Sequence, residues 1–315
     1  MTLAACCTSH SPLYGLHDPE AEVVAEVEAA LDAARRFIAA YDPELVVLFG
    51  VDHLNGFLYD MMPQFCIGTR ATAIGDYGTA MGDLSVPATA ARQCAEAVVA
   101  QDLDVALSEE MSVDHGFAQP LAFFFGSLNA VPVVPIFINA NAVPRSPVRR
   151  ARALGRAVGN WAEVTGQRVL LLGSGGLSHD PPLPSMGGAD AAVVDRLLHG
   201  VTPEGRRTRE ASTLAAAQQF ARGEGPLQTL APKFDRAFET LIAENRLSDV
   251  DGWTDEWLTR VGGRGGHEVR SWVATFGALE AAGPWSIESS YYRPIPEWIV
   301  GFGLMTGHPM RSRNT

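Results

Sequence analysis

The feature that most constrains this chain is an apolar run followed directly by a turn that carries a histidine. The clearest example is residues 45–49, which precede Gly50 and the pair Asp52-His53. A short continuous apolar run is typical of a strand buried on both faces of a parallel sheet. The same layout recurs where residues 3–7 precede His10, residues 105–107 precede His115, and residues 169–172 precede His179.

These four turns predict both a fold class and a site. In open α/β sheets, ligands bind in the crevice beyond the carboxyl ends of the strands. We therefore expect His10, His53, His115 and His179 to converge at one edge of the sheet. The predicted fold is α/β, with a mostly parallel central sheet flanked by helices.

The segments between the runs complete this prediction. Apolar residues at helical spacing favour helices over residues 19–41 and 117–128, and also after Pro87 and Pro147. Residues 57–67 and 72–77 read as an irregular hairpin.

The C-terminal half differs in character. Residues 189–260 are helical with little strand signal, so we expect a helical insertion at about 185–262 within a single domain, residues 1–315. The glycine-rich residues 262–266 predict a flexible hinge before a helix over 267–282. Residues 285–304 close the chain and are rich in aromatics and proline.

Charge and composition exclude several classes of function. The net charge is −12, from 24 basic and 36 acidic residues, which argues against nucleic acid or an anionic membrane surface as a partner. No apolar run approaches the ~20 residues that span a bilayer, and no signal peptide is evident. The four cysteines lack a paired framework, so we expect reduced thiols and a cytoplasmic protein.

A metal site is the first chemistry that the pattern favours. We expect the strands that precede His10 and His53 to be neighbours, and the late candidates for a third ligand are the pair His267-Glu268 and Asp180. Two histidines and one carboxylate form the ligand set of non-haem Fe(II), which leaves positions open for substrate and oxygen. The same ligands also serve hydrolytic zinc sites, so the residues alone leave both metals open.

His115 and His179 differ from the metal candidates because both lie in glycine-bearing turns. Such turns allow an imidazole to approach a bound substrate, where it can accept or donate a proton near pH 7. The alternative is that either ring only orients another group. Ser174 lies in Gly-Ser-Gly-Gly, which lacks the Gly-x-Ser-x-Gly pattern of a nucleophile elbow and favours a tight turn instead.

These motifs resemble those of the class III extradiol ring-cleaving dioxygenases, the superfamily of the protocatechuate 4,5-dioxygenase catalytic subunit. The similarity extends over essentially the whole chain. It is carried by residues 9–13 (Ser-His-Ser-Pro-Leu), 43–49, 52–57, 73–76, 113–121, 172–179 and 291–299 (Tyr-Tyr-Arg-Pro-Ile-Pro-Glu-Trp-Ile).

The resemblance implies a ligand set and an activity. It implies Fe(2+) held by His10, His53 and Glu268, with His115 as proton donor and His179 as proton acceptor. The implied substrates are a catechol and O2. Within the superfamily the sequence is most similar to bacterial enzymes that open the ring of 3-carboxyethylcatechol in the catabolism of aromatic compounds. Another catechol, a zinc enzyme and a non-catalytic metal-binding member remain alternatives.

The carboxylate of such a substrate needs a local cation, because the overall charge does not attract it. We expect Arg293 in that role, with a structural salt bridge as the alternative, and Ser178 and Asn55 as further substrate-binding residues. The aromatic tail and the helical insertion also make a homo-oligomer the expected assembly.

Overall fold

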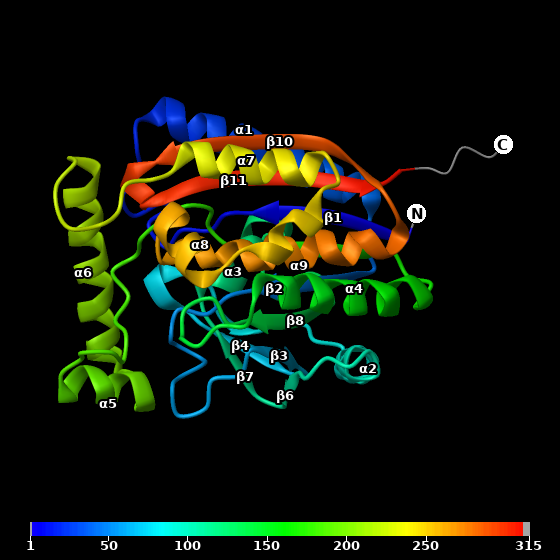
Figure 1. The fold of residues 1–315 in the computed structure, drawn as a ribbon, viewed down its shortest axis with the longest axis horizontal. Coiled ribbons are helices and arrows are strands. Elements are labelled where there is room, and N and C mark those ends of the chain that lie inside the picture. Colours follow the sequence, from blue (N-terminus) through cyan, green and yellow to red (C-terminus); the bar gives the residue numbers. More distant parts are fainter. Residues whose placement is uncertain (1, 311–315) are drawn as a thin grey trace.

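An eight-stranded sheet runs through residues 2–310, which are the residues that the computed structural model describes (Figure 1). The ends of the predicted domain, residue 1 and residues 311–315, lie outside the described residues. The strands of this sheet are β1 (Leu3–Thr8), β2 (Leu45–Gly50), β3 (Phe65–Gly68), β6 (Ala106–Ser108), β8 (Val133–Ile138), β9 (Val169–Ser174), β10 (Trp285–Ile295) and β11 (Val300–Pro309).

The strand order confirms the predicted α/β class. The strands lie in the order β10-β11-β1-β9-β2-β8-β3-β6. The pairs β1–β9, β9–β2, β2–β8 and β3–β6 are parallel, and the other three neighbouring pairs are antiparallel. The four central strands β1, β9, β2 and β8 therefore all point the same way, and their carboxyl ends meet at one edge.

Helices cover both faces of this sheet and explain its apolar composition. One face packs against α2 (Ala88–Val99), α4 (Val148–Val164) and α9 (Val269–Leu279), and the other packs against α1 (Ala21–Tyr41) and α3 (His115–Phe125). Successive side chains of a strand point to opposite faces. All six residues of β1 are consequently buried. The four cysteines are free and buried.

The predicted helical insertion is confirmed. Residues 175–284 contain no strand, and the insertion itself consists of α5 (Ala191–His199), α6 (Pro203–Ala221), α7 (Pro232–Ala243) and α8 (Asp255–Gly262). The Thr202 side chain caps α6, whose first residue is Pro203, a favourable start for a helix. Figure 1 shows α6 standing beyond one end of the sheet, whereas α7 lies across β10.

The C-terminal strands are the largest element that the sequence did not predict. Residues 285–309 form β10 and β11, a long antiparallel pair that joins the sheet through β1. Pro294 obscured this pair, because proline cannot donate to a strand ladder. It is tolerated here because β10 is an edge strand.

The predicted hairpin is wrong. β3 belongs to the main sheet, whereas β4 (Ala71–Ile74) joins a separate sheet with β5 (Met81–Asp83) and β7 (Met111–Val113). Strands of three or four residues are too short to establish an alternating pattern that identifies their partners. No helix among the described residues is long and apolar enough to cross a membrane.

Candidate active site

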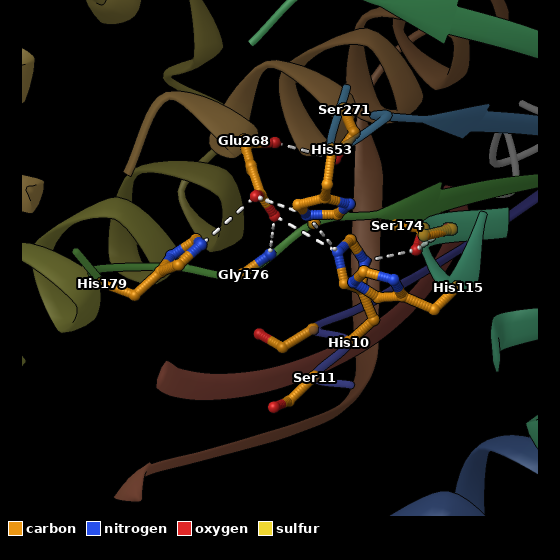
Figure 2. Close-up of polar contacts among 12 residues, drawn as sticks. His10, Ser11, His53, His115, Ser174, Gly176, His179, Glu268 and Ser271 are labelled. Carbon is orange, nitrogen blue, oxygen red and sulfur yellow. Dashed lines mark hydrogen bonds and ion pairs between the residues drawn. The ribbon is translucent and has the colours of Figure 1, made fainter. Parts of the chain in front are cut away.

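The four histidines converge with Glu268 at the carboxyl ends of the parallel strands (Figure 2). His10 and His53 follow β1 and β2, which are not neighbours as predicted, because β9 lies between them. Their Nε2 atoms nevertheless lie 3.4 Å apart. His179 follows β9, and His115 opens α3. All five side chains are buried, and none of these residues is more than 9% exposed. The predicted convergence of the four turns is therefore what the fold produces.

Hydrogen bonds fix the tautomer of His10. Ser174 Oγ donates to the carbonyl of Gly116 at 2.6 Å, which uses its only proton. The same oxygen lies 2.9 Å from His10 Nδ1, so it accepts a hydrogen bond from that nitrogen. The neutral ring of His10 therefore carries its proton on Nδ1 and presents a free lone pair on Nε2.

His53 is oriented in the same way by a carboxylate. Its Nδ1 donates to Asp114 Oδ2 at 3.0 Å, and its backbone N–H donates to the same oxygen at 2.8 Å. A carboxylate behind an imidazole holds the ring in place and raises its basicity as a metal ligand. The Nε2 lone pairs of His10 and His53 thus face each other, an arrangement that is favourable only with a proton or a cation between them.

Glu268 supplies the third donor. Its Oε1 lies 3.3 Å from His53 Nε2, its Oε2 lies 3.5 Å from His10 Nε2, and Oε2 accepts a hydrogen bond from the backbone N–H of Gly176. Donor atoms 3.3–3.5 Å apart leave a point about 2 Å from each, which is the usual length of metal–nitrogen and metal–oxygen bonds. These residues fit a metal ion.

The other two candidates for the third ligand, Asp180 and His267, interact with other residues. Asp180 forms a 2.7 Å ion pair with Arg264. The two ring nitrogens of His267 contact Thr259 and Arg270. A different donor set does exist, because His115 offers a ring nitrogen within 4.8 Å of the ligand atoms of His10 and His53.

The electrostatics of the site favour a cation. Burial acts to raise the pKa of the Glu268 carboxyl, but the imidazoles of His179 and His10 hold that pKa well below its usual range. Burial acts to lower the pKa of His53, yet Asp114 and Glu268 raise it well above its usual value. For His10, burial dominates and lowers the pKa to about 3. Ionised carboxylates beside a neutral imidazole are the surroundings in which a metal cation is stable.

His115 stands beside this donor set and retains one free nitrogen. The Asp114 side chain caps α3, so the helix begins at His115 and not near Phe117 as predicted. Its Nδ1 lies 2.6 Å from Asp76 Oδ2, and its backbone N–H donates to Asp76 Oδ1. The His115 Nε2 is buried without a hydrogen-bond partner, and its ring stacks on His53 with ring centroids 4.2 Å apart. This nitrogen is available to a bound molecule.

His179 approaches Glu268 from the opposite side (Figure 2). Its Nδ1 donates to the Leu177 carbonyl at 2.9 Å, because a carbonyl can only accept. Its Nε2 lies 3.2 Å from Glu268 Oε1, and burial, which lowers the pKa of His179, is outweighed by Glu268, which raises it. The Glu268 carboxylate can only accept, so Nε2 of a protonated His179 donates to Oε1, and in the neutral ring the same nitrogen carries the lone pair.

The glycines of segment 262–266 leave room for His179 to pack against this segment. A Cβ on Gly265 would lie 2.1 Å from His179 Nε2, and one on Gly263 would lie 2.2 Å from the His179 carbonyl oxygen. Gly263 also has φ of 80°, a conformation that favours glycine. The prediction of a flexible hinge is wrong, because four of the five residues are buried and the segment packs tightly.

A cavity opens beside these residues, with an empty volume of about 630 Å³ that includes space open to solvent. Four of the five site residues line it; Glu268 lies behind them. Its remaining walls are mostly apolar. They consist of Ser11, Pro12, Leu13, Tyr77, Pro181, Pro182, Leu183, Arg209, Thr213, Trp298, Ile299 and Val300.

The structure places the three predicted substrate-binding residues outside the cavity lining. Ser178 Oγ donates to Asp235 at 2.6 Å and accepts from the Ala231 N–H, so it fastens the insertion to the His179 turn. The Asn55 amide donates to Asp114. Arg293 forms a 2.6 Å ion pair with Glu26 at the surface. For Arg293 the salt-bridge alternative is the one that the structure supports.

Sequence reasoning missed the residues that hold the histidines. Asp76, Asp114 and Ser174 each orient a site imidazole, and Arg209 lies in the cavity wall. Asp114 had a local signal, because an aspartate directly before a helix is a typical cap. The other three act on residues at least 39 positions away, and no pattern in the sequence announces those contacts.

The comparisons with known proteins agree with this geometry. A family model described as the catalytic LigB subunit of aromatic ring-opening dioxygenase matches residues 4–303. The chain belongs to the LigB family. This confirms the class III resemblance, and the chain is an extradiol catechol dioxygenase.

Relatives within the LigB family extend over almost the same length. A protein of Cupriavidus pinatubonensis is 53% identical over 305 residues, covering 96% of this chain and 97% of the relative. A protein of Mycolicibacterium vanbaalenii is 50% identical over 306 residues, with the same coverage. Both are named 2,3-dihydroxyphenylpropionate/2,3-dihydroxicinnamic acid 1,2-dioxygenase.

A solved structure shows the fold alone. An uncharacterized protein from Escherichia coli K12 matches with a TM-score of 0.53 and 13% identity, covering 96% of this chain and 98% of that one. The present chain and the Escherichia coli protein thus share a backbone arrangement.

Proposed function

We propose that this chain is an Fe(II)-dependent dioxygenase that cleaves 2,3-dihydroxyphenylpropionate (3-carboxyethylcatechol) beside its two hydroxyls, giving 2-hydroxy-6-oxonona-2,4-dienedioate. One observation carries the proposal. Two imidazole lone pairs and a buried carboxylate meet at 3.3–3.5 Å, beside two further histidines that have a nitrogen facing the cavity. The names of the relatives that are about 50% identical support the choice of substrate.

The proposed ligands of the iron are His10, His53 and Glu268. Iron is favoured over zinc because zinc has no redox chemistry, and a ring-opening dioxygenase must make O2 react with an aromatic ring. When bound, Fe(2+) would supply the electron transfer between catechol and O2, and the protein supplies geometry and protons. Three protein ligands leave positions open for both substrates.

His179 is proposed as the base that accepts a catechol proton. Its Nδ1–H is committed to the Leu177 carbonyl, so Nε2 carries the lone pair that faces the cavity. Removing a hydroxyl proton makes the catechol a stronger chelator of a cation. The charge left on His179 is stabilised by Glu268, 3.2 Å away.

His115 is proposed as the acid. The Asp76 carboxylate, 2.6 Å from Nδ1, holds the ring beside the cavity, and a protonated His115 carries its second proton on the unpartnered Nε2. A carboxylate–imidazolium pair beside the cavity can donate a proton to oxygen during ring cleavage. The two histidines therefore have opposite tasks because their Nδ1 atoms have different partners.

The relatives' names favour a second substrate as well. They pair 2,3-dihydroxyphenylpropionate with 2,3-dihydroxicinnamic acid, and both compounds carry a three-carbon side chain that ends in a carboxylate. The apolar walls formed by Leu13, Leu183 and Trp298 fit the aromatic ring and exclude water from it.

The test is an oxygen-uptake assay on anaerobically purified protein loaded with Fe(2+), using both acids and unsubstituted catechol. We expect one iron per chain, one O2 consumed per catechol, and a yellow ring-opened product, with the two acids preferred. Zinc-loaded protein serves as the control. An iron-loaded protein that consumes no O2 with any catechol would contradict the proposal. Cytoplasmic location and homo-oligomeric assembly stay predictions.

A further inference from the structure

One cation lies in the wall of the cavity. Among the residues that the structure describes, Arg209 is the only lysine or arginine that lines it. Arg209 belongs to α6, the insertion helix that stands beyond the end of the sheet in Figure 1. It therefore reaches the cavity from a different part of the fold than the proposed iron ligands.

Within residues 2–310, the charge of Arg209 has no carboxylate partner. No carboxylate of residues 2–310 lies within 4 Å of its guanidinium, which instead donates to the His53 carbonyl at 3.4 Å and to Asn55 Oδ1. Two arginines serve for comparison: Arg207, on the same helix, pairs with Glu204 at 2.9 Å, and Arg293 pairs with Glu26. Arg209 is thus held in place by neutral oxygens and keeps its positive charge available.

Contacts on either side hold α6 against the site. Arg206 donates to the Ile74 carbonyl at 3.2 Å, and Glu210 accepts a 2.9 Å hydrogen bond from the Tyr77 N–H. The Tyr77 hydroxyl donates to Thr213 Oγ1 at 3.0 Å, while the Tyr77 ring lies 5.4 Å from that of His115. The guanidinium of Arg209 is therefore fixed on the side of the cavity near His53 and Tyr77.

We propose that Arg209 binds the side-chain carboxylate of the catechol substrate, which makes α6 the element that selects acidic catechols. The inference rests on the proposed function and names the residue responsible for its substrate class. A chain of net charge −12 needs a local cation to hold a carboxylate, and arginine offers parallel N–H groups that match one. Arg209 lies in the lining and lacks a carboxylate partner, whereas Arg293 has neither property.

The test compares two substrates of similar shape on iron-loaded full-length protein. These are 3-(2-carboxyethyl)catechol and 3-propylcatechol, which differ in the carboxylate. For Arg209→Met we expect the ratio of their kcat/KM values to fall about 10- to 100-fold, the usual cost of losing a hydrogen-bonded charge partner. Arg209→Lys keeps the charge without the planar donor pair and should give an intermediate ratio. Arg207→Met removes the same charge from an exposed position of α6 and should leave the ratio unchanged.

The outcomes separate this inference from the proposed function. If the wild-type protein shows no preference for the carboxylate-bearing catechol, the substrate assignment fails, and the role of Arg209 fails with it. If the wild type has the preference and Arg209→Met retains it, only the role of Arg209 is rejected. The role of Arg209 is also rejected if Arg209→Met loses equal activity on both catechols. The same holds if the variant loses iron through the His53 contact while its preference for the carboxylate-bearing catechol is unchanged.

Discussion

The cavity has two sides that are built in different ways. One side is the sheet-edge site, which we define as His10, His53, His115, His179 and Glu268; the other is the α6 wall, which consists of Arg209 and Thr213. Each histidine of the sheet-edge site is buried, and its Nδ1 is held by another group of the chain. The α6 wall is carried by a helix with only two buried residues, Ala217 and Phe220.

We expect this difference to separate reactivity from substrate selectivity. The sheet-edge site stands on strand ends and on the start of α9, so its donor atoms are fixed by the same packing that stabilises the core. The α6 wall is joined to the remainder of the fold by a small number of polar contacts. A region with few buried apolar contacts can change at small cost to global stability. Substitutions in the two regions should therefore have separable effects.

The largest effect is expected from Glu268→Gln. The amide cannot supply the negative charge that balances a metal between two imidazoles, so we expect most iron to be lost and turnover to fall by roughly 10³-fold or more. Iron content, oxygen uptake and circular dichroism measure this. Asp180→Asn is the matched control, because Asp180 pairs with Arg264. Full iron content in Glu268→Gln would favour the donor set that contains His115.

A smaller loss is expected from His115→Gln and His179→Gln. Each should lower kcat by roughly 10²–10⁴-fold, the usual contribution of a positioned acid or base, while iron and catechol still bind. Single-turnover kinetics with iron analysis distinguish this result from loss of a ligand. A His115→Gln protein without iron would show that His115 is a ligand, and near-normal turnover in both variants would reject the acid–base assignment.

Asp76→Asn tests how far the sheet-edge site depends on its supporting contacts. Asp76 holds both the Nδ1 and the backbone N–H of His115, so its loss should lower kcat by roughly 10- to 100-fold with little change in KM. Asp83→Asn, on the exposed strand β5, should change neither quantity. An unchanged kcat in Asp76→Asn would argue against this supporting role.

The smallest effect concerns the stability of the insertion. Burial, and then the neighbouring Asp235, raise the pKa of Glu239 on α7 from 4.5 to about 8. Between these values the folded chain binds a proton that the unfolded chain releases, so this group's contribution to the free energy of unfolding decreases as pH rises from about 4.5 to 8.

The Glu239→Gln variant should therefore gain stability relative to the wild type as the pH rises, by an amount on the order of 1 kcal/mol at pH 8. Urea unfolding at pH 5 and pH 8 measures this difference. Ring cleavage should be unaffected, because Glu239 does not line the cavity. Parallel stability curves for the two proteins would show that Glu239 is ionised in the folded state.

Much of the fold was predictable because its signals are local. β2 and β8 follow from continuous apolar runs, and α1 follows from apolar residues at helical spacing. β10 was not predictable in this way, because an edge strand tolerates proline and polar residues that disguise its pattern.

For the site, the sequence by itself predicted which residues lie together at the sheet edge. A histidine placed directly after a buried strand must emerge at the strand's carboxyl end, so the convergence of His10 and His53 follows from local pattern and fold class. The family motifs supplied Glu268 as the third member. These inferences needed only neighbours in the chain.

The tertiary structure decided what each of these residues can do. The tautomer of His10 is set by Ser174, 164 positions away, and the orientation of the His115 ring is set by Asp76, 39 positions away. The cation nearest the site comes from a helix whose Arg209 is 156 positions from His53. The physical reason is that proton positions and unpaired charges depend on which atoms lie within about 3 Å, and in this chain folding alone brings those atoms together.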